Sequence, residues 1–280
     1  MKITILGTAA ISYPFPFCNC NNCKLARIHK GKSIRKNSSI LINDDLLIDL
    51  CSDVPIAMDM YNQDMSKIKY LLQTHTHYDH FSKYLLINRI ENGIDKRLNK
   101  LEIYSHPKCF EHIHNKILNY ENIDIFTEEG RKKLNININN MNKGEIVSFG
   151  TYQVKAIETK HDLENGSLLY VITENDKNLF YATDTNALTD IALNQLSEYK
   201  LDIVIMDHTY GNVENTNSHL NENLFLEQIS KLKKLNIIDE QTLIYGTHIS
   251  HVGLSYHELI EELAIKKGYH IAYDGMELEI

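Results

Sequence analysis

The chain alternates short apolar runs with polar turns, a pattern that predicts many short strands, and carries longer amphipathic stretches that predict helices. Strands are predicted at residues 2–6, 39–42, 46–50, 70–73, 101–104, 146–149, 152–157, 167–173, 178–182, 202–206 and 242–245. Helices are predicted at residues 55–61, 81–90, 107–119, 187–198, 220–235 and 256–267. Strands mostly come first in each half and helices later, without a repeat of fixed period. This order predicts two sheets faced by helices.

Two stretches show neither pattern clearly. The residues between Gly7 and the second strand contain clustered cysteines and prolines and are expected to form a long loop. Residues 131–143 are rich in asparagine and polar, and we expect them to form a surface insertion.

The composition is that of an ordinary globular protein. Of 280 residues, 43% are hydrophobic and 24% are charged, which excludes a disordered or fibrous chain. The length allows two domains, but a sandwich of this size often folds as one, so we expect a single domain over residues 1–280. The sequence shows neither a membrane-spanning run nor a signal peptide, and we expect a cytoplasmic protein that does not bind membranes.

The net charge of −8 bears on the partners of the protein. An acidic surface repels polyanions, so the sequence argues against nucleic acid as a partner. A local cationic site remains compatible with a small anionic ester as substrate. The sequence also leaves a homodimer open.

The strongest chemical signal is the run His75-x-His77-x-Asp79-His80, which follows a predicted strand. Alternate residues of an extended turn project to one side, so His75 and His77 can bind one cation while Asp79 and His80 reach a second. Imidazole and carboxylate are suitable ligands for several divalent metals. The run therefore predicts part of a binuclear metal site.

The remaining ligands are expected at the ends of later strands. His161, Asp184 and His248 each lie just past a predicted strand, as a site at one edge of a sandwich requires. Each alone is a weak signal, because polar residues are common at strand ends.

A second metal site is predicted by the cysteines Cys18, Cys20 and Cys23. Three crowded thiols favour metal binding over a disulfide framework, and tetrahedral zinc needs a fourth ligand. His251 lies three residues after His248, so that one segment can serve both sites. A redox thiol cluster is the alternative.

Taken together, these motifs resemble the metallo-β-lactamase superfamily, whose ligand motifs occur in this order. The resemblance implies an α/β fold, a four-layer αββα sandwich with two metals at one edge. It further implies that His75, His77 and His161 hold one metal, that Asp79, His80 and His248 hold the other, and that Asp184 bridges them. Ligand type leaves zinc, manganese and iron open for the active site.

Two branches of the superfamily are similar to this chain. Cys18-x-Cys20-x-x-Cys23 with the late pair His248 and His251 resembles the cyclic phosphate phosphodiesterases of phosphonate degradation. The early run Gly7-Thr8-Ala9-Ala10 before the cysteines is also similar to the pyrroloquinoline quinone biosynthesis B proteins. The catalytic ligand set of that branch tends to be incomplete, whereas every position is filled here, which favours a hydrolase.

The sequence therefore predicts a metal-dependent phosphodiesterase that acts on a small phosphate ester, cyclic or open. Two metals lower the pKa of water and polarise phosphoryl oxygens, and Asp79 is expected to orient the attacking water. His219 resembles an additional active-site histidine of the family and is expected to assist the leaving group, with His208 as the rival. The alternatives are a hydrolase of carboxylic esters, thioesters or lactones, and a non-hydrolytic protein of cofactor biosynthesis.

Residues on either side of the cysteines are expected to affect the pocket. The loop over residues 14–17 is aromatic, which departs from the family pattern and is expected to reshape the pocket. Lys24 and Arg27, just after the cysteines, are candidates for contact with a phosphate.

Overall fold

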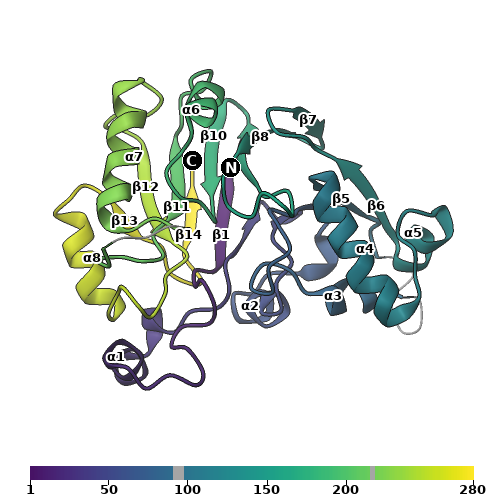
Figure 1. The fold of residues 1–280 in the computed structure, drawn as a ribbon, viewed down its shortest axis with the longest axis horizontal. Helices are drawn as coiled ribbons and strands as arrows, with labels where there is room; N and C mark the ends of the chain where they lie inside the picture. Colours follow the sequence, from purple (N-terminus) through teal and green to yellow (C-terminus); the bar gives the residue numbers. More distant parts are fainter. Residues whose placement is uncertain (91–97, 215–217) are drawn as a thin grey trace.

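The computed structural model describes residues 1–90, 98–214 and 218–280, and these form two seven-stranded sheets with helices on their outer faces (Figure 1). The first sheet has the order β14-β1-β2-β3-β4-β5-β6. It is antiparallel from β14 to β3 and parallel from β3 to β6. Its strands are β1 (Lys2–Gly7), β2 (Ser39–Ile42), β3 (Leu46–Ile48), β4 (Tyr70–Leu72), β5 (Leu101–Ser105), β6 (Ile136–Asn140) and β14 (Glu277–Glu279).

The second sheet has the order β13-β12-β11-β10-β9-β8-β7. Strands β10 to β13 are parallel, and β7 to β10 are antiparallel. Its strands are β7 (Ile146–Phe149), β8 (Tyr152–Glu158), β9 (Leu168–Glu174), β10 (Lys177–Ala182), β11 (Ile203–Asp207), β12 (Leu243–Thr247) and β13 (His270–Ile271).

The helices lie on both outer faces of the pair of sheets, except for α1, which lies beside the N-terminal loop (Figure 1). Helices α2 to α4 cover the first sheet, and α6 to α8 cover the second. The α-helices are α1 (Asn21–His29), α2 (Val54–Met60), α3 (Lys83–Ile87), α4 (Pro107–Glu121), α5 (Glu128–Leu134), α6 (Asp190–Leu196), α7 (Glu222–Lys234) and α8 (His257–Ile265). Short 3₁₀ helices occur at Gly31–Ser33 and Met65–Lys67.

Strand alternation explains the layers. In β2 and β3, Ile40 and Ile48 face the second sheet, whereas Leu41 and Leu47 face the helices. A strand residue and its neighbour point to opposite faces, so each all-apolar strand contributes side chains to two apolar clusters, one on each face of its sheet. The three large apolar clusters of the described residues follow from this: one lies between the sheets and one under each set of helices. The predicted four-layer αββα sandwich is confirmed.

Two local predictions were wrong. The N-terminal loop contains α1, which begins where the Cys20 side chain caps the Cys23 N–H. The stretch predicted to be an insertion instead forms the end of α5 and the whole of β6, which extends the first sheet beside β5. Asparagines in β6 bind Glu102 of β5, so polar pairing at a sheet edge replaces the apolar pattern that marks a buried strand.

The strand directions bring one set of loops to one edge. Strands β8, β10, β11 and β12 point the same way, and the loops that follow them emerge together. In the first sheet, β3 and β4 are parallel and also end at a common edge. The backbone N–H of Ile249 donates to the carbonyl of Thr8 at 2.7 Å, which joins the sheets there.

Among the described residues, no helix combines the length and the apolar character needed to cross a bilayer.

Candidate metal centre and active site

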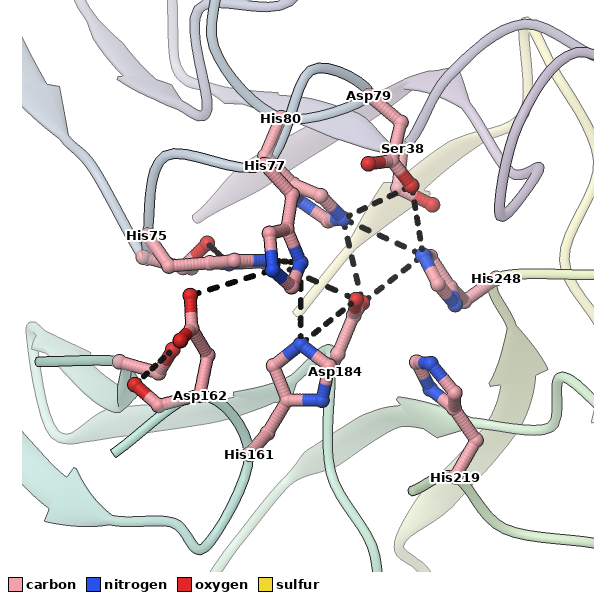
Figure 2. Close-up of polar contacts among 12 residues, drawn as sticks. Ser38, His75, His77, Asp79, His80, His161, Asp162, Asp184, His219 and His248 are labelled. Atoms are coloured by element: carbon pink, nitrogen blue, oxygen red, sulfur yellow. Dashed lines mark hydrogen bonds and ion pairs between the residues drawn. The ribbon is translucent and has the colours of Figure 1, made fainter. Parts of the chain in front are cut away.

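The histidine motif lies on the loop between β4 and α3. Backbone N–H groups of His80 and Phe81 both donate to the carbonyl of His77, at 3.0 and 2.9 Å, which folds the loop into a tight turn. The turn directs His75, His77 and His80 toward the loops that follow β8, β10 and β12 (Figure 2).

The first group of potential metal ligands joins the loop after β4 with the loops after β8 and β10. His77 Nδ1 lies 3.0 Å from His75 Nε2 and 3.3 Å from His161 Nε2. Asp184 Oδ2 lies 3.7 Å from His75 Nε2 and 3.5 Å from His161 Nε2. Three imidazole nitrogens and one carboxylate oxygen thus surround one point, a donor set suited to a divalent metal.

The second group shares Asp184 with the first. Asp184 Oδ1 lies 2.9 Å from His248 Nε2 and 3.2 Å from His80 Nε2. Asp79 Oδ2 lies 3.6 Å from each of these two nitrogens. One oxygen of Asp184 therefore faces each group, and Figure 2 shows this carboxylate at the centre of the cluster.

Hydrogen bonds on the far side of the rings fix the direction of His75 and His80. The Thr74 hydroxyl donates to Asp49 at 2.8 Å and therefore accepts a hydrogen bond from His75 Nδ1, 3.0 Å away. Asp49 also accepts from His80 Nδ1 at 2.7 Å. With Nδ1 protonated in both rings, each Nε2 presents a lone pair to the cluster.

The same arrangement recurs at His77 and His248. The Thr209 hydroxyl donates to Asp207 at 2.8 Å and accepts from His248 Nδ1, also at 2.8 Å. Asp162 Oδ2 lies 3.2 Å from His77 Nε2, so that His77 offers Nδ1 instead. Carboxylates behind the imidazoles are typical of metal-ligating histidines because they fix the tautomer.

These residues fit a pair of divalent cations. The Nε2 atoms of His80 and His248 are 3.2 Å apart and both face the carboxylate of Asp184, an arrangement suited to binding one cation. Asp184 Oδ1 is buried and accepts no well-directed hydrogen bond from the residues described. Although burial lowers the pKa of His248, Asp184 raises it to about 10, so the carboxylates create a site for positive charge.

His219 lies beside the cluster, whereas His208 does not. The His219 ring centre lies 5.0 Å from that of His161 and 5.2 Å from that of His248. Its Nδ1 is 2.7 Å from Asp207 Oδ2, which leaves Nε2 for another partner. His208 Nε2 instead lies 3.0 Å from the Tyr269 hydroxyl and is buried beneath the helices.

The structure also brings the cysteines together with His251. One potential ligand atom from each of Cys18, Cys20, Cys23 and His251 lies within 4.8 Å of the others. Despite burial, the Cys23 backbone N–H and other hydrogen bonds lower the pKa of Cys20 to about 6, which favours a thiolate at the start of α1. The donor set is that of a closed Cys₃His zinc site.

Sequence reasoning missed the residues behind the ligands: Asp49, Thr74, Asp162, Asp207 and Thr209. The available signal was weak, because Asp49 and Asp207 stand at or just past strand ends as many turn residues do. Asp49 and His248 both adopt positive φ, 64° and 60°, a strained conformation that is common at functional sites.

A cavity of about 610 Å³ opens above the cluster. Asp79, His161, Asp184, His219 and His248 lie among the residues that line it. Arg27 does not face this cavity: its guanidinium donates to the carbonyls of Cys18 and Phe15, at 2.8 and 3.0 Å. It therefore stabilises the cysteine loop rather than an incoming phosphate.

The sequence profile of the beta-lactamase superfamily domain matches residues 46–249, which is most of the chain. No protein of curated function matches the chain in sequence. A diphosphatase from the PhnP family has a similar solved structure, with 20% identity and a TM-score of 0.71 over 100% of this chain and 96% of its own. Zinc-bound PqqB from Methylobacterium extorquens gives 17% identity and a TM-score of 0.72 over the full length of both chains. The short form of human tRNase Z gives 16% identity and a TM-score of 0.66, over 100% of this chain and 99% of its own.

Proposed function

The chain belongs to the metallo-β-lactamase superfamily, and on that premise we propose that it is a binuclear metal-dependent phosphodiesterase acting on small phosphate esters. The observation that carries the proposal is the position of Asp184, whose Oδ2 faces His75 and His161 and whose Oδ1 faces His80 and His248. A filled ligand set of this kind is suited to hydrolysis.

His75, His77 and His161 would hold one metal, Asp79, His80 and His248 the other, and Asp184 both. Two such metals supply an activated water at neutral pH and polarise the oxygens of a phosphoryl group. Zinc, manganese and iron all suit these ligands. A third metal, zinc, would be held by Cys18, Cys20, Cys23 and His251.

Asp79 and His219 have separate roles in this proposal, one on the attacking water and one on the departing oxygen. The carboxylate of Asp79 lines the cavity and can accept a hydrogen bond from the attacking water, which orients it toward phosphorus. His219, held by Asp207, has Nε2 free to donate a proton or a hydrogen bond to the departing oxygen. Burial lowers the pKa of His219, but Asp207 outweighs this and raises it, which favours the proton-donating form.

The test compares ester classes on purified, metal-loaded protein. Bis(4-nitrophenyl) phosphate and 4-nitrophenyl butyrate release the same product, so that one assay reports both activities. We expect turnover of the phosphodiester, abolished by chelation and restored by metal. Turnover of the carboxylic ester alone would replace the proposal with an esterase, and inertness to both would favour a non-hydrolytic role.

A further inference from the structure

The cavity above the metal ligands has an aromatic wall. Phe15 comes from the N-terminal loop, Tyr78 from the loop after β4, and Tyr210 from the segment between β11 and α7. Ala10, Ile11 and Val252 complete the apolar part of the lining. Three separate segments thus contribute aromatic residues to the lining of one cavity.

The same lining lacks lysine and arginine side chains. Among the described residues that line the cavity there is no Lys or Arg. Arg27 is bound to backbone carbonyls, and Lys116 donates to the carbonyl of Thr76 at 2.5 Å. Positive charge for a substrate would therefore come from the metal centre and His219 alone, and a second phosphate would have no cationic partner.

Phe15 is held in a fixed position, as a recognition residue must be. Its ring stacks on the His251 ring with centres 5.2 Å apart and an interplanar angle of 11°. Its carbonyl accepts from the Arg27 guanidinium at 3.0 Å and from the Cys18 N–H at 3.1 Å. The cysteine cluster thus orders one wall of the cavity before any ligand arrives, which lowers the entropy cost of binding.

Tyr78 differs from Phe15 in its exposure. It is 66% exposed although it lies between two potential metal ligands in the sequence. An exposed ring at the mouth of a cavity is available for stacking on a ligand.

We infer that the preferred substrates are phosphodiesters with a single negative charge and a planar aromatic ring, aryl or nucleobase, on one ester oxygen, bound by Phe15 and Tyr78. This inference rests on the proposed phosphodiesterase function and names its substrate class. Stacking on an aromatic side chain increases affinity by about five- to tenfold for one ring.

The kinetic test holds the leaving group and the charge constant. Phenyl 4-nitrophenyl phosphate and methyl 4-nitrophenyl phosphate both release 4-nitrophenolate and both carry one negative charge. We expect kcat/KM to be about fivefold or more higher for the phenyl ester, mainly through a lower KM. Equal values for the two esters would overturn the inference.

Two variants assign the preference to the named rings. Tyr78→Ala removes an exposed ring without opening a core, and Phe15→Leu keeps the apolar volume beside His251 while removing the aromatic face. Each should reduce the phenyl-to-methyl ratio by at least half. Phe17→Ala is the matched control, because Phe17 is 99% exposed on the same loop and does not line the cavity. A ratio unchanged in both variants would contradict the assignment.

A further arm tests the charge limit. Thymidine 5′-(4-nitrophenyl phosphate) should be hydrolysed no more slowly, in kcat/KM, than the same compound bearing a 3′-phosphate. A tenfold gain from the added phosphate would show a cationic subsite and overturn the single-charge specificity.

A binding experiment separates this inference from the proposed function. Diphenylphosphinate and dimethylphosphinate carry the same single charge and have no ester bond to hydrolyse, so calorimetry on metal-loaded protein measures their affinity without turnover. If no diester is hydrolysed, the proposed function fails, yet tighter binding of diphenylphosphinate that is lost in Tyr78→Ala would still support aromatic recognition. Equal affinity for the two ligands would overturn it.

Discussion

His80 Nε2 and His248 Nε2 lie 3.2 Å apart, although 168 positions of sequence separate the two residues. Asp49 holds the far nitrogen of one ring, and Thr209 holds that of the other. Both nitrogens also face Asp184 Oδ1, at 3.2 and 2.9 Å, so residues from opposite sheets form a site suited to a cation.

The role of Asp49 is testable through metal affinity. Asp49→Asn should weaken binding of the metal held by His80 by about 10- to 100-fold, because an amide has one acceptor oxygen and cannot replace both oxygens that accept hydrogen bonds from His80 and Thr74. Competition with a chelating dye measures this affinity. Asp44→Asn, which removes only an exposed ion pair with Lys67, is the control and should leave it unchanged.

Asp79→Asn should reduce phosphodiester turnover by at least about 100-fold while the fold is retained, because the amide is a poor metal ligand and orients water differently. Steady-state kinetics at saturating metal, with circular dichroism as the check on folding, provide the measurement. Activity within a few-fold of wild type would remove Asp79 from the proposed mechanism.

His219→Ala should distinguish leaving groups. A poor alkoxide leaving group needs a proton donor, so alkyl diesters should lose about 100-fold in kcat, whereas activated 4-nitrophenyl esters should lose far less. His208→Ala serves as the comparison, since His208 contacts Tyr269 rather than the cluster. Equal losses on both ester types would mean that His219 positions substrate instead.

The pair His219 and Asp207 also predicts a pH effect. The carboxylate raises the pKa of His219, so a protonated His219 is retained to higher pH and activity is lost as pH rises through that pKa. Asp207→Asn removes this effect and should move the alkaline limb of the kcat profile to lower pH. An alkaline limb that does not move would show that another group produces it.

Cys20→Ser tests the cysteine cluster. The variant should lose one zinc and melt at lower temperature, because a closed zinc site stabilises the fold that forms it. Two metals should remain per chain, bound at the other site. Cys109→Ala is the control, since Cys109 is a buried free thiol outside the cluster. Loss of all metals in Cys20→Ser would contradict the prediction, because it would show that the two sites bind metal cooperatively.

Much of the fold could be predicted because its strands follow simple patterns. Apolar runs such as those of β4, β10 and β11 end at polar residues, and these ends proved to mark one edge of the sandwich. The edge strand β6 was missed because asparagines pair with Glu102 there and hide the apolar signal. Helix α1 was missed because a cysteine, not a usual capping residue, begins it.

The candidate ligands could be predicted because His75 to His80 form one dense motif, while the residues that orient them could not. Asp49 and Thr74 contact each other although they are 25 positions apart in the sequence, and nothing in their local sequence distinguishes them from ordinary turn residues. Only the folded arrangement shows that the Asp49 carboxylate orients two imidazoles. It accepts a hydrogen bond from His80 directly and orients His75 through Thr74.

Elemental analysis of the purified wild-type protein tests the central claim most directly. If the imidazoles and carboxylates at the sheet edge bind a pair of cations, the protein will contain three metals per chain, of which two are removed by mild chelation and one zinc remains. A protein that takes up a single metal under metal-replete conditions, and loses it when Cys20 is replaced, would contradict the account.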